Sequence, residues 1–310
     1  MKKFIALLLT SVLCTSMVAC SSDSTTDVPS AQPTEGENSS GTTTADSSSE
    51  TTTDEKQQEI TFEEIVAVDN EECVINITGI DPDNMWGYSL NVNLENKSVD
   101  KTYMYTVKSA SINGVEADPL FATEVAPEKK ANKEINFNTS NLEEAGIHEF
   151  TDIEITFRVS DSNDWMADDV GFETVNVYPS GQENATQFIR EPQPDDTILL
   201  DNEYVTAIVT GYEVDSIWGY TANLFLVNKT DKNVMFSTDE VSVNGYMVNP
   251  FFANSVSAGK CSFASMSWSD TMLTENGISE IDEIEFQIRA YDSDDFMSED
   301  FAKEIVTLTP

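Results

Sequence analysis

The chain is poor in positive charge and in histidine. Its 310 residues include 16 Lys and Arg against 56 Asp and Glu, so the formal net charge is −40. Phosphate binding needs clustered cations, so nucleic acid is a poor partner for this chain, and electrostatic adsorption to anionic lipid is disfavoured as well. The single histidine, His148, excludes a multi-histidine metal site and leaves one candidate base for a Ser-His-Asp or Cys-His site.

Cysteine and long apolar runs are also scarce. The sequence has four cysteines, and its N-terminal apolar run extends only from Phe4 to Ala19, after the basic start Met1-Lys2-Lys3. A membrane-spanning helix needs about 20 apolar residues, whereas a run of this length after a basic start is typical of a secretory signal. We therefore expect residues 1–19 to be an export signal.

The apolar run ends at a cysteine. Ala19 is a small residue directly before Cys20, while Cys14 follows the larger Leu13. The end of the run resembles the lipobox of bacterial lipoproteins, with Met17 where Leu is usual. The resemblance implies cleavage before Cys20 and attachment of diacylglycerol to its thiol. The protein is then extracytoplasmic and anchored to the bacterial cell membrane through this lipid. The alternative is an ordinary signal peptide followed by an incidental cysteine.

The segment after the cysteine has the composition of a tether. Residues 21–58 are mainly Ser, Thr, Asp, Glu, Gly, Pro and Gln, with no aromatic residue, Ile or Leu. Such a segment cannot bury enough apolar surface to offset the entropy of ordering. We predict that residues 20–58 form a disordered linker.

The remainder of the chain is an internal duplication. Gly79–Tyr88 matches Gly211–Tyr220 at an offset of 132 (218 − 86 for the tryptophans), and Asn113-Gly114 matches Asn244-Gly245 at 131 after one deletion. Such self-similarity indicates one structural unit present twice. We predict one domain over residues 59–179, a linker over 180–196 and a second domain over 197–310.

Each copy has the pattern of β-structure. Apolar and polar residues alternate over 88–94, 153–159 and 284–290, the period of a strand with one wet face. The two Asn-Gly pairs predict tight turns, and the capping-box pattern from Ser140 to Glu143 predicts a short helix that stops at Gly146. About seven strands per copy, without β-α-β alternation, predict an all-β protein of two antiparallel β-sandwiches.

Short turn motifs recur in both copies. The motifs of the second copy are Val227–Lys232, Val243–Gly245 and Val256–Lys260, and the first copy agrees at Leu94–Ser98 and Ile112–Gly114. Ala126-Pro-Glu-Lys129 departs from the third motif. This set of motifs resembles the immunoglobulin-like (telokin-like) domain of Gram-positive surface lipoproteins. The resemblance implies two tandem immunoglobulin-like sandwiches in an extracytoplasmic setting and implies no catalytic residues.

An acidic loop follows the strand near the end of each copy. Carboxylates are suitable ligands for Ca²⁺, which takes 6–8 oxygen atoms, so the loops are candidate calcium sites. The alternative, which we favour, is a solvated turn in which Trp165 or Phe296 closes the end of the sandwich. The candidate ligands are Asp161, Asp164 and Asp168 in the first copy, and Asp292, Asp294 and Asp295 in the second.

A tryptophan near an aspartate is the second candidate site. Asp83 and Trp86 in the first copy correspond to Asp215 and Trp218 in the second. An exposed indole beside a carboxylate would suit a sugar ring, whereas a buried indole would contribute a large apolar area to the core. We favour burial and keep the glycan platform as the alternative.

Other features concern surfaces and cysteines. Phe225 and Val227 stand on the nominally wet face of their strand, which predicts contact with the first copy or with a partner protein. Arg158 and Arg289 are expected in surface ion pairs rather than as ligand clamps.

Cys73 and Cys261 occupy positions that do not correspond in the two copies, so a disulfide within each domain is excluded and a bridge between domains is the only remaining pairing of the two.

These observations predict function only in outline. A pair of neighbouring carboxylates could indicate a glycoside hydrolase, but acids are so abundant here that some pair lies close by chance, so the pattern has no specificity. Ser279 replaces His148 in the second copy, which argues against a duplicated catalytic histidine. We expect a monomeric, non-enzymatic, lipid-anchored binding or adhesion protein with a glycan or protein ligand and no required cofactor. The alternatives are a ligand-free structural stalk and a carbohydrate-binding accessory protein.

Overall fold

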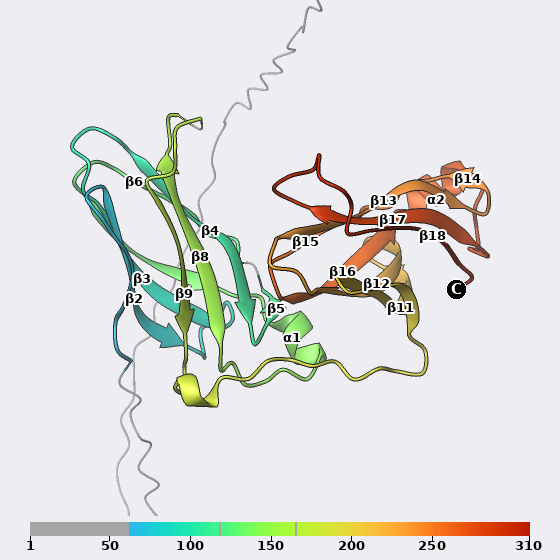
Figure 1. The fold of residues 1–310 in the computed structure, drawn as a ribbon, viewed down its shortest axis with the longest axis horizontal. Coiled ribbons are helices and arrows are strands. Elements are labelled where there is room, and N and C mark those ends of the chain that lie inside the picture. Colours follow the sequence, from blue (N-terminus) through green and yellow to red (C-terminus); the bar gives the residue numbers. More distant parts are fainter. Residues whose placement is uncertain (1–61, 118, 165) are drawn as a thin grey trace, which may run out of the picture. The chain divides into compact units, whose positions relative to one another are not determined.

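A computed structural model describes residues 62–117, 119–164 and 166–310, with the side chain of Asp215 left out. The predicted export signal, the lipidation site Cys20 and the linker over 20–58 lie outside these residues. The described part is all-β, with antiparallel sheets and two short helices (Figure 1). Neither helix has the length and apolar character needed to cross a membrane.

The first copy is built from two sheets around one core. One sheet has the strand order β1-β2-β3-β7, and in the other β4 pairs with β5, β6 and β8, and β8 pairs with β9. Inward side chains from both sheets, among them Ile75, Leu90, Tyr105 and Phe157, share one buried cluster. The elements are β1 (Ile65–Asp69), β2 (Cys73–Asp81), β3 (Ser89–Asn96), β4 (Tyr103–Ile112), β5 (Val115–Glu116), β6 (Ala122–Val125), β7 (Lys130–Asn136), α1 (Ser140–Glu144), β8 (Ile153–Asp161) and β9 (Gly171–Val177).

The second copy repeats this order after the short 3-10 helix η1 (Gln182–Asn184). Strands β10, β11, β12 and β16 lie on one side of its core, and β13, β14, β15, β17 and β18 on the other. The elements are β10 (Thr197–Asp201), β11 (Val205–Ser216), β12 (Gly219–Asn228), β13 (Val234–Val243), β14 (Tyr246–Met247), β15 (Ala253–Val256), β16 (Cys261–Trp268), α2 (Asp270–Glu275), β17 (Ile284–Asp292) and β18 (Ala302–Leu308).

Irregularities of the strands are duplicated along with the strands. The register of β1 on β2 shifts between Val66 and Val68, and that of β10 on β11 shifts between Ile198 and Leu200, at the same offset of 132 (198 − 66). A second shift, directly before Gly79 in β2, recurs directly before Gly211 in β11. Bulges bend and twist a strand, so the two copies share their curvature as well as their order of elements.

Several local predictions are confirmed and two are corrected. Asn113 and Asn244 both have φ of +51°, as the predicted Asn-Gly turns require. The helix at Ser140 and its stop at Gly146, with φ of +81°, are also confirmed. The capping box is wrong, because Thr139 takes the N-cap position and makes no side-chain cap bond. Within the described residues each copy has nine strands rather than seven, since β5 and β6, like β14 and β15, are too short to show a period.

The two copies are joined by a strand contact as well as by the chain. Residues 59–310 form one unit, and the single-residue parallel pair of Cys261 with Val115 connects β16 to β5. This pair joins one sheet of each copy into the order β10-β11-β12-β16-β5-β4-β8-β9. The predicted contact of Phe225 with the first copy is confirmed, because Phe225 is 6% exposed and belongs to the first core cluster, against which Val227 also packs.

Cys73 and Cys261 are free thiols in this structure, so the bridge between domains is not formed. Both are buried, Cys73 in the first core and Cys261 at the junction with β5. Burial raises the pKa of the Cys73 thiol to about 11 and that of Cys261 to about 12. A thiol with a raised pKa is a poor nucleophile, since the thiolate is the reactive form.

Candidate functional site

The loop between β2 and β3 is held in shape by short polar contacts. The Asn84 Oδ1 accepts a hydrogen bond from the Trp86 N–H at 2.9 Å, and the Asn84 carbonyl accepts one from the Gly87 N–H at 3.0 Å. Gly87 has φ of +107°, and a Cβ at this position would lie 2.5 Å from the Phe137 carbonyl oxygen. Only glycine fits this close approach, so the loop turns tightly against the end of β7.

This loop leaves the Trp86 side chain 69% exposed, and the corresponding Trp218 is 66% exposed. The burial that we favoured for both indoles is therefore wrong. The physical reason lies in the glycine that follows each tryptophan: Gly219 has φ of +88° and approaches the Trp268 carbonyl as Gly87 approaches that of Phe137. Each glycine brings the main chain against the end of the neighbouring strand, and the indole before it lies on the outside of the core.

Trp86 lines a groove on the outer face of the first sheet. The groove has a volume of about 630 Å³ and is formed by residues of β2, β3 and β7 together with Trp86. Its charged lining residues are Glu134 and Lys133, and Asp83 does not line it. The polar lining residues are Thr78, Asn91, Asn132, Lys133, Glu134 and Asn136.

Amide and carboxylate groups in and beside the groove are already oriented. The Asn84 Nδ2 donates to the Glu134 Oε2 at 3.2 Å, and the Asn93 Nδ2 donates to the Asn132 Oδ1 at 2.8 Å. These contacts fix side-chain amides on β3 and in the loop between β2 and β3 against β7, beside an exposed aromatic ring. Asn91, Asn132 and Glu134 were not predicted as site residues from the sequence, although their place at alternate polar positions of β3 and β7 was a usable signal.

The equivalent face of the second copy has a different chemistry. Phe263 and Ala264 stand where the first copy has Asn132 and Lys133 (263 − 132 = 131). Phe263 packs against Phe225 with ring centroids 5.2 Å apart and against Phe188 at 5.8 Å. The second copy has a smaller cavity of about 300 Å³ on this face, lined by Thr210, Asn223 and Ser265. Phe263 and residues of the first copy also line it, and Trp218 does not.

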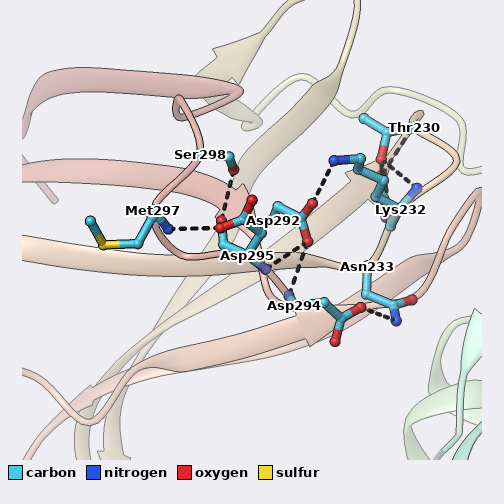
Figure 2. A network of polar contacts seen from close by, with 9 residues as sticks. Thr230, Lys232, Asn233, Asp292, Asp294, Asp295, Met297 and Ser298 are labelled. Atoms are coloured by element: carbon cyan, nitrogen blue, oxygen red, sulfur yellow. Dashed lines mark hydrogen bonds and ion pairs between the residues drawn. The ribbon is translucent and has the colours of Figure 1, made fainter.

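The acidic loops are organised by lysines and main-chain amides. Figure 2 shows the second loop, where the Lys232 Nζ lies 2.6 Å from the Asp292 Oδ2, and the Asp292 Oδ1 accepts from the N–H groups of Asp294 and Asp295. The lysine, then these amides, lower the pKa of the Asp292 carboxyl. In the first loop Lys101 lies 3.5 Å from Asp161.

The other predicted calcium ligands are not brought together. Asp294 accepts from the Asn233 Nδ2, Asp164 and Asp295 each accept from a main-chain N–H two residues later, and Asp168 is exposed. Within the described segments, no three His, Cys, Asp or Glu side chains form a group that could hold a metal ion. This geometry favours the solvated turn.

Two further expectations concern these loops. Phe296 is 72% exposed, so it does not close the sandwich end, and Trp165 lies outside the described residues. The expected ion pairs are confirmed: Arg158 lies 2.8 Å from Asp169, and Arg289 lies 2.8 Å from Asp300.

Comparison with known proteins gives no relative for this chain. No protein-family model matches the sequence, and no curated protein matches it. Among solved structures, the YadV chaperone is similar at 12% identity and a TM-score of 0.23, over 71% of this chain and 92% of the chaperone. The exo-chitosanase CsxA of Amycolatopsis orientalis is similar at 13% identity and a TM-score of 0.24, over 76% of this chain and 26% of the enzyme. These distant likenesses carry no argument about activity.

Proposed function

We propose that this chain is a lipid-anchored extracytoplasmic binding protein whose first copy binds carbohydrate in the Trp86 groove. The observation that carries the proposal is the exposed indole of Trp86 at the edge of a groove lined by amides and one carboxylate. An aromatic ring offers an apolar face for a sugar ring. Amides donate and accept hydrogen bonds, and carboxylates accept them, as sugar hydroxyls require.

The groove has the form of a binding site rather than of a reaction centre. It lies along the outer face of a sheet, where an extended chain of sugar units can contact β2, β3 and β7 in turn. Its one carboxylate, Glu134, is engaged by Asn84. General acid–base hydrolysis of a glycosidic bond needs a pair of carboxyl groups on either side of that bond, and the groove supplies one.

We further propose that residues 59–179 and 197–310 are two immunoglobulin-like domains of a surface lipoprotein. Two core clusters and the duplicated order of elements support this division. The second domain would then position the first, and Phe188 of the linker would cover the apolar face of the second domain at Phe225. Lipid on Cys20 and the segment 20–58 would keep both domains outside the cell at the membrane.

A glycan-binding experiment with a matched pair of variants tests the site. The full chain and its Trp86→Ala and Trp218→Ala variants are applied to immobilised oligosaccharides, and the affinity for each bound glycan is measured. Both indoles are equally exposed, but only Trp86 lines the groove. We expect Trp86→Ala to weaken binding about tenfold or more and Trp218→Ala to leave it unchanged. If no glycan binds, the ligand-free structural role replaces the proposal. If Trp86→Ala retains full affinity for a bound glycan, the groove is not the binding site.

A fractionation experiment tests the anchor separately. Wild type and Cys20→Ala are expressed in a bacterium that processes lipoproteins, and the protein is quantified in the membrane fraction and in the medium. We expect the wild type in the membrane fraction and the variant in the medium, with Cys14→Ala behaving as wild type. Retention of Cys20→Ala in the membrane fraction would overturn the anchor without bearing on the groove.

A further inference from the structure

A second cavity, independent of the Trp86 groove, lies at the end of the second core. Its volume is about 520 Å³, and it is formed by β11, β12, α2 and the segment before β17. The floor is apolar, with Leu273 and Ile278 buried in the second core cluster. The walls are two tyrosines, Tyr212 and Tyr220, whose ring centroids lie 5.9 Å apart at an interplanar angle of 33°.

The charged groups that line this cavity are all acidic. Asp270 at the start of α2 and Glu280 before β17 are exposed at its rim, and no Lys or Arg of the described residues lines it. Neither carboxylate takes part in an ion pair within the described part of the chain. The cavity therefore combines aromatic faces with uncompensated negative charge.

The first copy has Tyr88 at the position of Tyr220 and Glu149 at that of Glu280 (220 − 88 = 132, 280 − 149 = 131), but it lacks the other two groups. Ile80 replaces Tyr212 (212 − 80 = 132) and Thr139 replaces Asp270 (270 − 139 = 131). Phe150 replaces Ile281, and its ring packs edge-on against Tyr88 with centroids 5.0 Å apart. Since the two copies share their fold, the aromatic pair and the added carboxylate are specific to the second copy and are not required by the fold.

We propose that this cavity binds a small organic cation, an amine or quaternary ammonium group. A cation over the face of a tyrosine is attracted by the ring quadrupole, most strongly where water is excluded. Tyr212 and Tyr220 supply aromatic surface along the lining of the cavity, while Asp270 and Glu280 supply opposite charge at its mouth. A chain with a net charge of −40 also attracts cations from solution.

Tetramethylammonium is the probe that tests the proposal, and tert-butanol is its uncharged counterpart of similar shape. Binding of each to the full chain is measured by titration calorimetry and by NMR line broadening of the probe. We expect saturable binding of tetramethylammonium that weakens as salt is added, and no saturable binding of tert-butanol. Equal binding of the two probes, or no saturable binding of the cation, would overturn the proposal.

Substitutions taken from the first copy locate the site. Tyr212→Ile removes one aromatic wall, Asp270→Thr removes one carboxylate, and Ile281→Phe fills the cavity as Phe150 fills its equivalent. We expect each substitution to lower the affinity for tetramethylammonium about fivefold or more, and Trp86→Ala to leave this affinity unchanged.

Thermal melts establish that each variant is folded. Asp270 is an exposed side chain, so Asp270→Thr decides the outcome if either core substitution fails to fold. Unchanged affinity in a folded Tyr212→Ile or Asp270→Thr variant would overturn the assignment to this cavity.

Discussion

The main-chain N–H of Cys261 donates a hydrogen bond to the carbonyl oxygen of Gly114 at 3.0 Å. These residues are 147 positions apart (261 − 114), and each begins or precedes a strand at the edge of its own copy. The Nζ of Lys260, the residue before Cys261, lies 3.1 Å from the Glu154 Oε1. Main-chain pairing and an ion pair thus reinforce the apolar contact around Phe225 between the two copies.

Truncation of Phe225 tests the apolar part of this contact. Phe225→Ala removes a ring that is 6% exposed and packs against Phe188 at 6.2 Å and Phe263 at 5.2 Å. Loss of a buried Phe side chain typically costs about 3–5 kcal/mol. We expect a loss in this range in urea unfolding, against less than about 1 kcal/mol for Phe251→Ala, whose side chain is 65% exposed. Equal losses in the two variants would show that the contact does not stabilise the protein.

The glycine after Trp218 is expected to be irreplaceable. At Gly219→Ala the new Cβ would lie 2.2 Å from the Trp268 carbonyl oxygen, in a residue whose φ is +88°. A positive φ costs about 1–2 kcal/mol for an L-residue, and the clash with main-chain atoms adds to this.

Gly245→Ala is the matched control, because Gly245 has φ of +82° but open space around the new Cβ. Differential scanning calorimetry should show a lower melting temperature for both variants, with the larger decrease for Gly219→Ala. A decrease of the same size in both would mean that the close approach to Trp268 contributes nothing.

Stability is expected to decrease at alkaline pH. Burial raises the pKa of Tyr88 and of Tyr220 to about 12, from an ordinary value near 10. Between these values the unfolded chain loses phenol protons that the folded protein retains, so the free energy of unfolding falls as pH rises through about 10 to 12. Urea midpoints measured across this interval should decrease, and the midpoint of Tyr220→Phe should decrease less than that of wild type. Tyr246→Phe, at an exposed side chain, is the control, and an identical pH dependence in both variants would contradict the assignment.

The acidic loop of the second copy should depend on its lysine and not on calcium. Lys232→Met removes the cation 2.6 Å from Asp292, whose side chain is 6% exposed. A buried carboxylate without a partner is destabilising, so we expect a lower melting temperature.

Lys101→Met is the matched control, because its ion pair with Asp161 is longer, at 3.5 Å, and its loss should lower the melting temperature less.

Millimolar calcium should leave the melting temperature of the wild type unchanged relative to chelator. An increase in calcium would show that the loops do bind the ion.

Motifs that recur in both copies were informative about the fold because their contacts are local or repeated. Asn96 and Asn228 are buried, and each donates from its side chain to the main-chain carbonyls of two later segments. Lys97 and Lys229 each bridge to an aspartate at the end of the first strand of their copy. These contacts explain the Asn-Lys pair as a structural element of each copy.

The residues of the Trp86 groove were harder to predict because they depend on neighbours that are distant in the sequence. The groove beside Trp86 includes Asn91 on β3 and Asn132 and Glu134 on β7, about 40 positions apart in the chain (132 − 91 = 41) yet on adjacent strands. Asp83, nearer in sequence, lies outside the groove. Proximity along the chain was a poor guide to proximity in space.

The sequence by itself determined the duplication, the alternating strands, the Asn-Gly turns and the apolar contact face at Phe225. Each of these follows from the periodicity or the identity of residues that are close together in the chain. Only the tertiary structure decided that Trp86 and Trp218 face solvent, that Lys232 already engages Asp292, and that the second core ends in an aromatic cavity. These outcomes depend on how closely main-chain segments approach and which side chains then fill the space, and residue order alone does not fix those distances.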